Sequence, residues 1–113
     1  ATVLANVPYE ARVHGEEIFG PVAPISVVDS LEEAVERAND TEFGLISYVF
    51  SRDISRALHL VERLEAEMIA LNTGVVSNPA APFGGVKQSG LGREGSHEGI
   101  EEYLETKYVG ISL

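Results

Sequence analysis

The chain has 113 residues, of which 44% are hydrophobic and 23% charged, a composition typical of a modest globular domain or a piece of a larger one. Its 8 basic and 18 acidic residues give a formal net charge of −10, which argues against nucleic acid and against a membrane surface as partners. The absence of Cys excludes disulfides, thiolate metal sites and a cysteine nucleophile, and without any signal-peptide pattern or membrane-length apolar run we expect a cytoplasmic protein.

The first predicted elements are a strand and a helix. The β-branched apolar run from Ala23 to Val28 predicts a buried strand. Ser30 and Glu33 then have the spacing of a helix capping box, and apolar residues recur at helical spacing until the pattern ends near Asp40.

A second strand, a second helix and a third strand follow with short connections. The runs from Leu45 to Ser51 and from Met68 to Thr73 predict strands. Between them, Asp53 precedes an apolar stripe from Ile54 to Leu64 that predicts a capped helix. The β-α-β-α-β order predicts an α/β fold with a parallel sheet, helices on its face and right-handed crossovers.

The alternation stops at a glycine-rich loop, Gly74 to Gly95, which contains six glycines and two prolines. A loop of this length in a compact domain is usually functional. A short helix is predicted over Glu94 to Glu105, and KYVGISL predicts a closing strand. No crossover returns this strand to the earlier sheet, so we expect it to pair outside the chain.

Within this loop, GLGREG (Gly90 to Gly95) spells the G-x-G-x-x-G pattern of a dinucleotide-binding turn. Such a turn needs a buried strand before it and an acidic residue about 20 positions after it. Here a loop precedes it and only 18 residues follow. We therefore interpret the glycines as residues that permit positive φ and close backbone packing.

Glu17 and Phe19 stand two positions apart just before the first predicted strand. This spacing allows a carboxylate and an aromatic face to approach one ligand, such as a ribose and a flat ring. A turn with an ordinary core Phe explains the same spacing, and spacing alone favours that interpretation.

Other polar residues give weaker signals. Ser77 and Asn78 lie in the glycine-rich loop, where they can bind the polar end of a substrate or simply form a turn. No two of the three histidines, His14, His59 and His97, are three or four residues apart, so we expect no metal site and no catalytic role for them.

Four blocks of the sequence resemble the aldehyde dehydrogenase superfamily, in the same order and at similar distances. They are EEIFGPVAPI (16–25), ANDTEFGL (38–45), MIALNTG (68–74) and PFGGVKQSGLGREG (82–95). From Ala81 onward the chain looks most like succinate-semialdehyde dehydrogenases.

The resemblance implies part of a longer, NAD- or NADP-dependent enzyme that oxidises succinate semialdehyde or a related aldehyde. Residues 1–105 would be the C-terminal portion of its catalytic domain, and residues 106–113 a strand that joins a homo-oligomer. The cofactor domain, the catalytic Cys and the general-base Glu would lie outside this chain. We therefore expect the chain to begin within the enzyme and to be inactive alone.

The same resemblance implies roles for single residues. Glu17 matches a Glu that hydrogen-bonds the nicotinamide ribose, and Phe19 matches a Phe that packs beside it. Ser77 matches a position that binds the substrate carboxylate in succinate-semialdehyde members, alongside arginines upstream of this chain. Phe83 matches an aromatic that walls the substrate tunnel.

Three charged residues have implied roles near the end of the chain. Glu94 matches a buried Glu implicated in proton relay in some members. Arg93 and Glu105 resemble structural partners in the contact network between subunits.

Without these blocks, two other interpretations stay open. One is a free-standing α/β module that binds a ligand or another chain without catalysis, because a fold does not fix a function. The other is a structural fragment that assembles through its unpaired end strand.

Overall fold

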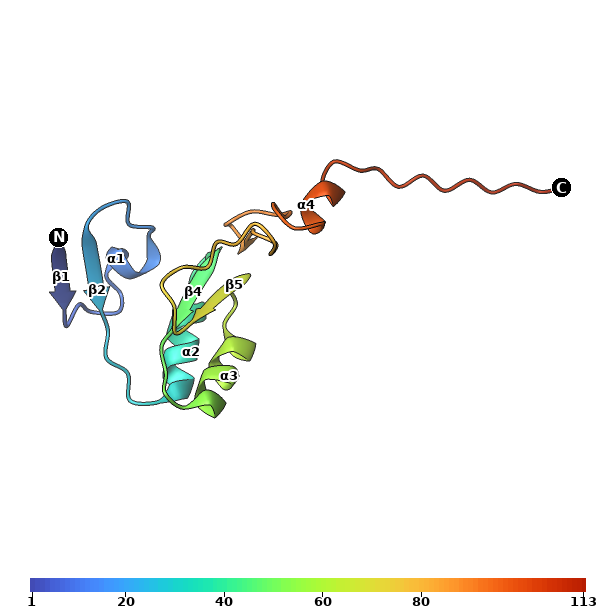
Figure 1. Ribbon diagram of the computed structural model, residues 1–113. Helices are drawn as coiled ribbons and strands as arrows, with labels where there is room; N and C mark the ends of the chain where they lie inside the picture. The colour runs from blue at the N-terminus through green and yellow to red at the C-terminus, as the bar shows by residue number, and fades with distance from the viewer.

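The computed structural model describes all residues 1–113 and has the mixed α/β content that the sequence predicts. The chain is elongated, measuring 71 × 32 × 26 Å, and its two ends lie far apart (Figure 1). Its radius of gyration is 18.4 Å, against about 13 to 14 Å for a compact domain of this length. Only 7 of 113 residues are buried, so the chain alone encloses a very small core.

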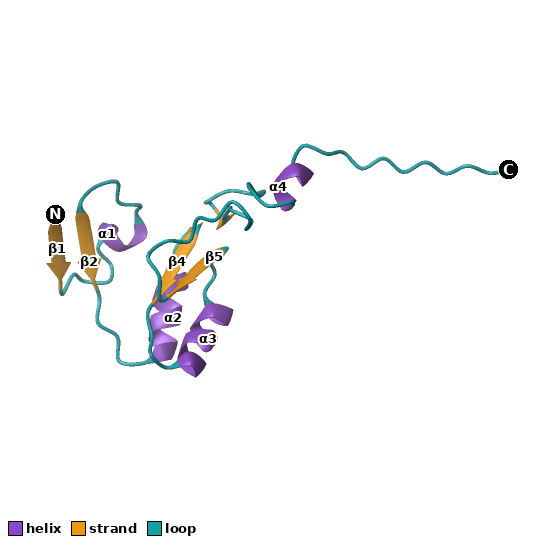
Figure 2. Ribbon diagram, in the orientation of Figure 1, coloured by secondary structure: helices purple, strands orange, loops and turns teal.

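The first strand pair stands apart from the rest (Figure 2). β1 (Thr2–Ala5) and β2 (Val22–Ile25) pair in parallel, with the short helix α1 (Arg12–Gly15) between them in sequence. The prediction of one parallel sheet over three strands is therefore wrong, because β2 pairs with β1 and not with the later strands. Strand pairing is a non-local choice that the apolar pattern leaves open, and Pro24, which has no amide hydrogen, suits β2 to an edge.

Two capped helices form the middle of the molecule. In α2 (Leu31–Asn39), the Ser30 hydroxyl accepts from the Glu33 amide at 3.0 Å, which confirms the predicted N-cap. In α3 (Ile54–Arg63), the Asp53 carboxylate accepts from two first-turn amides, at 2.9 and 3.1 Å. Both helices begin where the sequence predicts, since capping signals are local.

The main core lies where these helices pack against the second strand pair. β4 (Ile46–Val49) and β5 (Met68–Leu71) are parallel, as predicted for this pair, and α2 and α3 lie beside them in Figure 1. The buried apolar residues are Val35, Val49, Ala57, Met68 and Ala70. None of the helices has the length and apolar character that crossing a bilayer requires.

The glycine-rich loop returns toward the middle of the chain. Its β6 (Val86–Lys87) pairs antiparallel with β3 (Phe43–Gly44), which precedes β4. The loop therefore lies against the segment that enters the parallel pair, although its residues are distant in sequence.

The last helix is shorter than predicted. α4 covers only Glu98–Glu101, and the prediction of a helix over Glu94 to Glu105 is wrong at both ends. Gly95 (φ 67°) and Ser96 (φ 51°) have left-handed backbones, which delay the start of the helix. Beyond α4, Leu104 is 64% exposed, so no packing extends the helix. Residues 106–113 are exposed and unpaired within the chain, and the closing strand stays a prediction because its partner would lie outside.

Candidate functional site

The candidate site is centred on a backbone bridge between Phe83 and Glu94. The Phe83 amide donates to the Glu94 carbonyl at 2.8 Å, and the Glu94 amide donates to the Phe83 carbonyl at 2.7 Å. The bridge brings together two predicted site residues that are eleven positions apart. A hollow beside it is lined by Phe83, Arg93 and Glu94, together with Leu45 and Tyr103.

All three glycines of GLGREG have positive φ, and two of them, Gly92 and Gly95, line this hollow. Gly90, Gly92 and Gly95 have φ values of 114°, 83° and 67°, as the sequence interpretation of this stretch predicts. The next helix, α4, begins only at Glu98, so no helix N-terminus opens at the last glycine as a dinucleotide-binding turn requires.

Arg93 is the most highly connected side chain of the site. Its guanidinium forms a two-pronged ion pair with Glu67, with Nε–Oε1 at 2.9 Å and Nη2–Oε2 at 2.7 Å. It also donates to the carbonyls of Gly85, at 3.1 Å, and Gly92. Its own backbone amide donates to the Glu102 carboxylate at 3.2 Å.

Sequence reasoning did not identify Glu67 or Glu102. Glu67 stands just before β5, in a segment whose carboxylates look like an ordinary solvated face. Glu102 lies over Gly92, where a Cβ would meet its carboxylate oxygen at 2.8 Å. The only signal in the sequence was their placement, Glu67 just before a predicted strand and Glu102 inside the predicted last helix, and placement does not say which group each acid binds.

Glu17 lies in a neighbouring hollow. That hollow and the one beside Phe83 share Leu45 and Ser89 in their walls, so the two are adjacent. Ser89 fixes this junction, because its hydroxyl accepts from the Gly44 amide at 2.9 Å. The chain therefore places the predicted ribose-binding carboxylate near the predicted substrate wall.

The other predicted site residues lie outside these hollows. Phe19 is 95% exposed, and Ser77 is exposed in the loop after β5. Next to Ser77, the Asn78 side chain accepts from the Ala80 amide at 3.0 Å, which is the turn role that its residue type allows. Glu105 belongs to the exposed end of the chain and makes no hydrogen bond or ion pair with Arg93.

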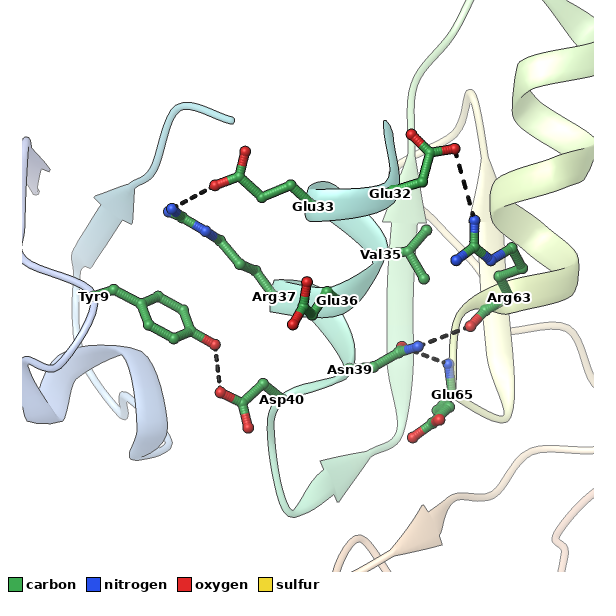
Figure 3. Close-up of a pocket in the computed structure, with 10 residues that line it drawn as sticks. All are labelled: Tyr9, Glu32, Glu33, Val35, Glu36, Arg37, Asn39, Asp40, Arg63 and Glu65. Atoms are coloured by element: carbon green, nitrogen blue, oxygen red, sulfur yellow. Dashed lines mark hydrogen bonds and ion pairs between the residues drawn. The ribbon is translucent and has the colours of Figure 1, made fainter. Parts of the chain in front are cut away.

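A separate acidic pocket joins the first strand pair to α2 (Figure 3). Arg37 pairs with Glu33 at 2.6 Å, and its guanidinium lies 5.0 Å from the centre of the Tyr9 ring. The Tyr9 hydroxyl donates to Asp40, and this hydrogen bond, with smaller contributions from desolvation and the charge of Asp40, raises the pKa of Tyr9.

No predicted site residue lines the acidic pocket. Across it, the Asn39 side chain donates to the Arg63 carbonyl and accepts from the Glu65 amide, both at 2.8 Å. These bonds join the ends of α2 and α3. We therefore interpret this pocket as structural, since its polar contacts connect α2 to α3.

The chain belongs to the aldehyde dehydrogenase family, whose model matches residues 1–109. It is 54% identical over 111 residues to succinate-semialdehyde dehydrogenase of Paenarthrobacter nicotinovorans, covering 98% of this chain and 25% of that protein. It is 58% identical over 108 residues to 3-sulfolactaldehyde dehydrogenase of Pseudomonas putida, covering 96% of this chain and 22% of that protein.

A solved structure has the same fold. The crystal structure of an E. coli NADP-dependent enzyme superposes with a TM-score of 0.92 and 51% identity, covering 98% of this chain and 23% of the other. The chain thus spans about a quarter of the length of the relatives that it matches. The resemblance carried by the four sequence blocks is confirmed at the level of the family.

Proposed function

We propose that this chain is the C-terminal part of the catalytic domain of an NAD(P)-dependent aldehyde dehydrogenase that oxidises succinate semialdehyde to the acid. The observation that carries the proposal is the 54% identity, over nearly the whole chain, to a relative named for that substrate. The relative named for 3-sulfolactaldehyde widens the substrate class. Both aldehydes are short and carry an anionic group at the far end.

Glu17 and Phe19 fit a nicotinamide cofactor. Glu17 takes part in no ion pair, and Phe19 leaves 95% of its side chain exposed, so an acceptor carboxylate and an aromatic face are free. Glu17 would accept hydrogen bonds from the ribose hydroxyls, while Phe19 would pack beside the ribose and ring. The bound cofactor supplies a hydride acceptor for the oxidation.

Ser77 and Phe83 would hold the aldehyde. The Ser77 side chain is exposed on its loop, where its hydroxyl can donate to the substrate carboxylate. Phe83 is half-buried and lines the hollow beside the bridge, as a tunnel wall requires. Glu94, on the other side of the bridge, would relay a proton; it is exposed in this chain, whereas the resemblance implies a buried Glu.

Two structural assignments complete the proposal. Residues 106–113 would join a sheet of another subunit, since Tyr108 and Ile111 are 91% and 80% exposed along an unpaired segment. Arg93 and Glu105 would be structural partners in the contact network between subunits. The alternative of a free-standing module is disfavoured. The chain is elongated and buries only 7 residues, so it needs other polypeptide to cover its apolar surface.

A substitution in the full-length enzyme tests the substrate assignment. Ser77→Ala should raise KM for succinate semialdehyde by about tenfold, since a hydrogen bond to a charged group is lost, and change KM for a neutral aldehyde of similar length less than about twofold. Reduction of the cofactor, followed at 340 nm, measures both. Ser55→Ala, an exposed serine on α3, is the matched control. Equal effects on the two aldehydes would remove Ser77 from carboxylate binding.

The 113-residue chain alone should oxidise neither aldehyde, because it contains no Cys to form the thiohemiacetal. Turnover by the purified chain with either cofactor would contradict this part of the proposal.

A further inference from the structure

We infer that Glu67 is a positioning residue, which acts through Arg93 to fix the part of the glycine-rich loop that carries Phe83. The inference rests on the proposed function in one respect, that Phe83 walls the aldehyde site. Neither the sequence pattern nor the family resemblance assigned a role to Glu67.

The contact between Glu67 and Arg93 is geometrically specific. The ion pair is bidentate: Nε of Arg93 lies 2.9 Å from Oε1 of Glu67, and Nη2 lies 2.7 Å from Oε2. The two side chains are only 25% and 30% exposed, so water screens this pair less than the open pairs of the surface. By comparison, the Arg12–Glu16 pair is 86% and 58% exposed, a setting in which ion pairs contribute little.

Arg93 transmits the position of Glu67 to the backbone beside Phe83. The Arg93 side chain lies over Gly84, where a Cβ would be 2.8 Å from its Cδ. It also donates to the carbonyls of Gly85 and Gly92, which closes the loop between them. Glu94, next in sequence, makes both bridge hydrogen bonds to Phe83. A displacement of Arg93 would therefore displace the bridge.

Glu67 provides a fixed point for this arrangement. It directly precedes Met68, the first residue of β5, which is buried in the main core. Glu67 is also bound to the β3 segment, because its amide donates to the Gly44 carbonyl at 3.2 Å. Arg93 is thus tied to one of the few well-packed parts of the chain.

A second ion pair acts on the same loop from the same segment. Lys87 contacts Glu65 at 2.7 Å and donates to the Asn39 and Thr41 carbonyls at 3.0 and 3.2 Å. Glu65 is 59% exposed, and Lys87 keeps its two carbonyl partners if Glu65 is removed. Loss of Glu67 should therefore loosen the glycine-rich loop more than loss of Glu65.

Hydrogen exchange of the full-length enzyme, in which other polypeptide covers this chain, tests the inference without reference to catalysis. Glu67→Gln should accelerate exchange of the Phe83 and Glu94 amides about five- to tenfold and leave the β4–β5 amides unchanged. Glu62→Gln, which makes the same charge change at an exposed position of α3, should change neither. Arg93→Lys should give an intermediate result, since Lys keeps the charge but loses the fork. In the double variant Glu67→Gln/Arg93→Gln, exchange should be no faster than in the faster single variant.

Unchanged exchange at Phe83 and Glu94 in Glu67→Gln would overturn the inference. Faster exchange throughout β4 and β5 would also overturn it, because Glu67 would then support the strands in general.

Kinetics of the full-length enzyme test the consequence for the substrate. Glu67→Gln should raise KM for succinate semialdehyde about three- to tenfold with little change in KM for the nicotinamide cofactor. An equal rise in both values would overturn the positioning role. If the full-length enzyme oxidises no aldehyde, the proposed function fails, whereas the exchange experiment still decides whether Glu67 fixes the loop.

Discussion

The side chain of Asn72 continues the β4–β5 pairing, because it binds both the backbone amide and the backbone carbonyl of Ser51. Its Oδ1 accepts from the Ser51 amide and its Nδ2 donates to the Ser51 carbonyl, each at 2.9 Å. Asn72 itself is left-handed, with φ of 54°, a conformation that Asn tolerates better than most residues. This side chain therefore fixes the end of the parallel pair, where the loop toward Ser77 begins.

Replacing Asn72 should separate its two contributions. Asn72→Gly keeps the left-handed backbone but loses both hydrogen bonds, and we expect a loss of about 1 kcal/mol in the free energy of unfolding. Asn72→Ala should lose about 1 kcal/mol more, because Ala is strained at positive φ. Urea titrations followed by circular dichroism measure both values. A larger loss for Gly than for Ala would contradict the backbone argument.

The cap of α3 should be detectable in the same experiment. Asp53→Ala removes a carboxylate that accepts from the Ser55 and Arg56 amides, and we expect a loss of about 1 kcal/mol. Asp29→Ala is the control, because only the Asp29 backbone amide, which donates to Glu33, makes a hydrogen bond. Equal losses in the two variants would mean that the cap contributes nothing specific.

Tyr9 should titrate at a higher pH in the folded chain than in the unfolded chain. The hydrogen bond to Asp40 raises the pKa of Tyr9, so the folded state holds the phenol proton more tightly. The resulting stabilisation is present below the unfolded pKa and is lost as pH rises through the folded pKa. Absorbance near 295 nm follows the phenols, and Tyr9→Phe identifies the Tyr9 transition by its disappearance.

Asp40→Ala should lower the pKa of Tyr9 toward its ordinary value. An unchanged Tyr9 transition in this variant would show that another cause raises the pKa.

Gly84 should tolerate no side chain, whereas Gly74 should. A Cβ on Gly84 would lie 2.5 Å from the Gly92 carbonyl oxygen, which is a backbone atom, and 2.8 Å from the Cδ of Arg93. We expect Gly84→Ala to accelerate amide exchange at Phe83 and to destabilise the loop by about 1 to 3 kcal/mol. Gly74→Ala meets open space and should have little effect. Slow exchange in both variants would contradict the close packing of Gly84.

The helices are predictable from the sequence because their determinants are local. Ser30 and Asp53 lie within three residues of the amides that they cap. The pairing of β2 depends instead on β1, from which α1 and its flanking loops separate it. The apolar run predicts the strand β2 but does not encode which strand it pairs with, so the predicted single sheet is wrong.

The candidate site shows the same division. Phe83, Arg93 and Glu94 belong to one block of sequence, and a resemblance over that block names all three. Glu67 lies 26 positions from Arg93 and is one of several acids near the end of α3. Only the fold selects it, because β5 and the returning loop place its carboxylate opposite the guanidinium.

The separation of the two parallel strand pairs has a consequence for cooperativity. All five buried apolar residues belong to α2, α3, β4 and β5, while β1 and β2 contain none. Tyr9, in the segment that follows β1, is linked to this unit by its hydrogen bond to Asp40 and by the Arg37 guanidinium over its ring. Polar links of this kind transmit little unfolding free energy from one unit to the other. The isolated chain should therefore denature in two stages, with β1 and β2 separating before the helices and strands around Val35 and Ala70 lose their packing.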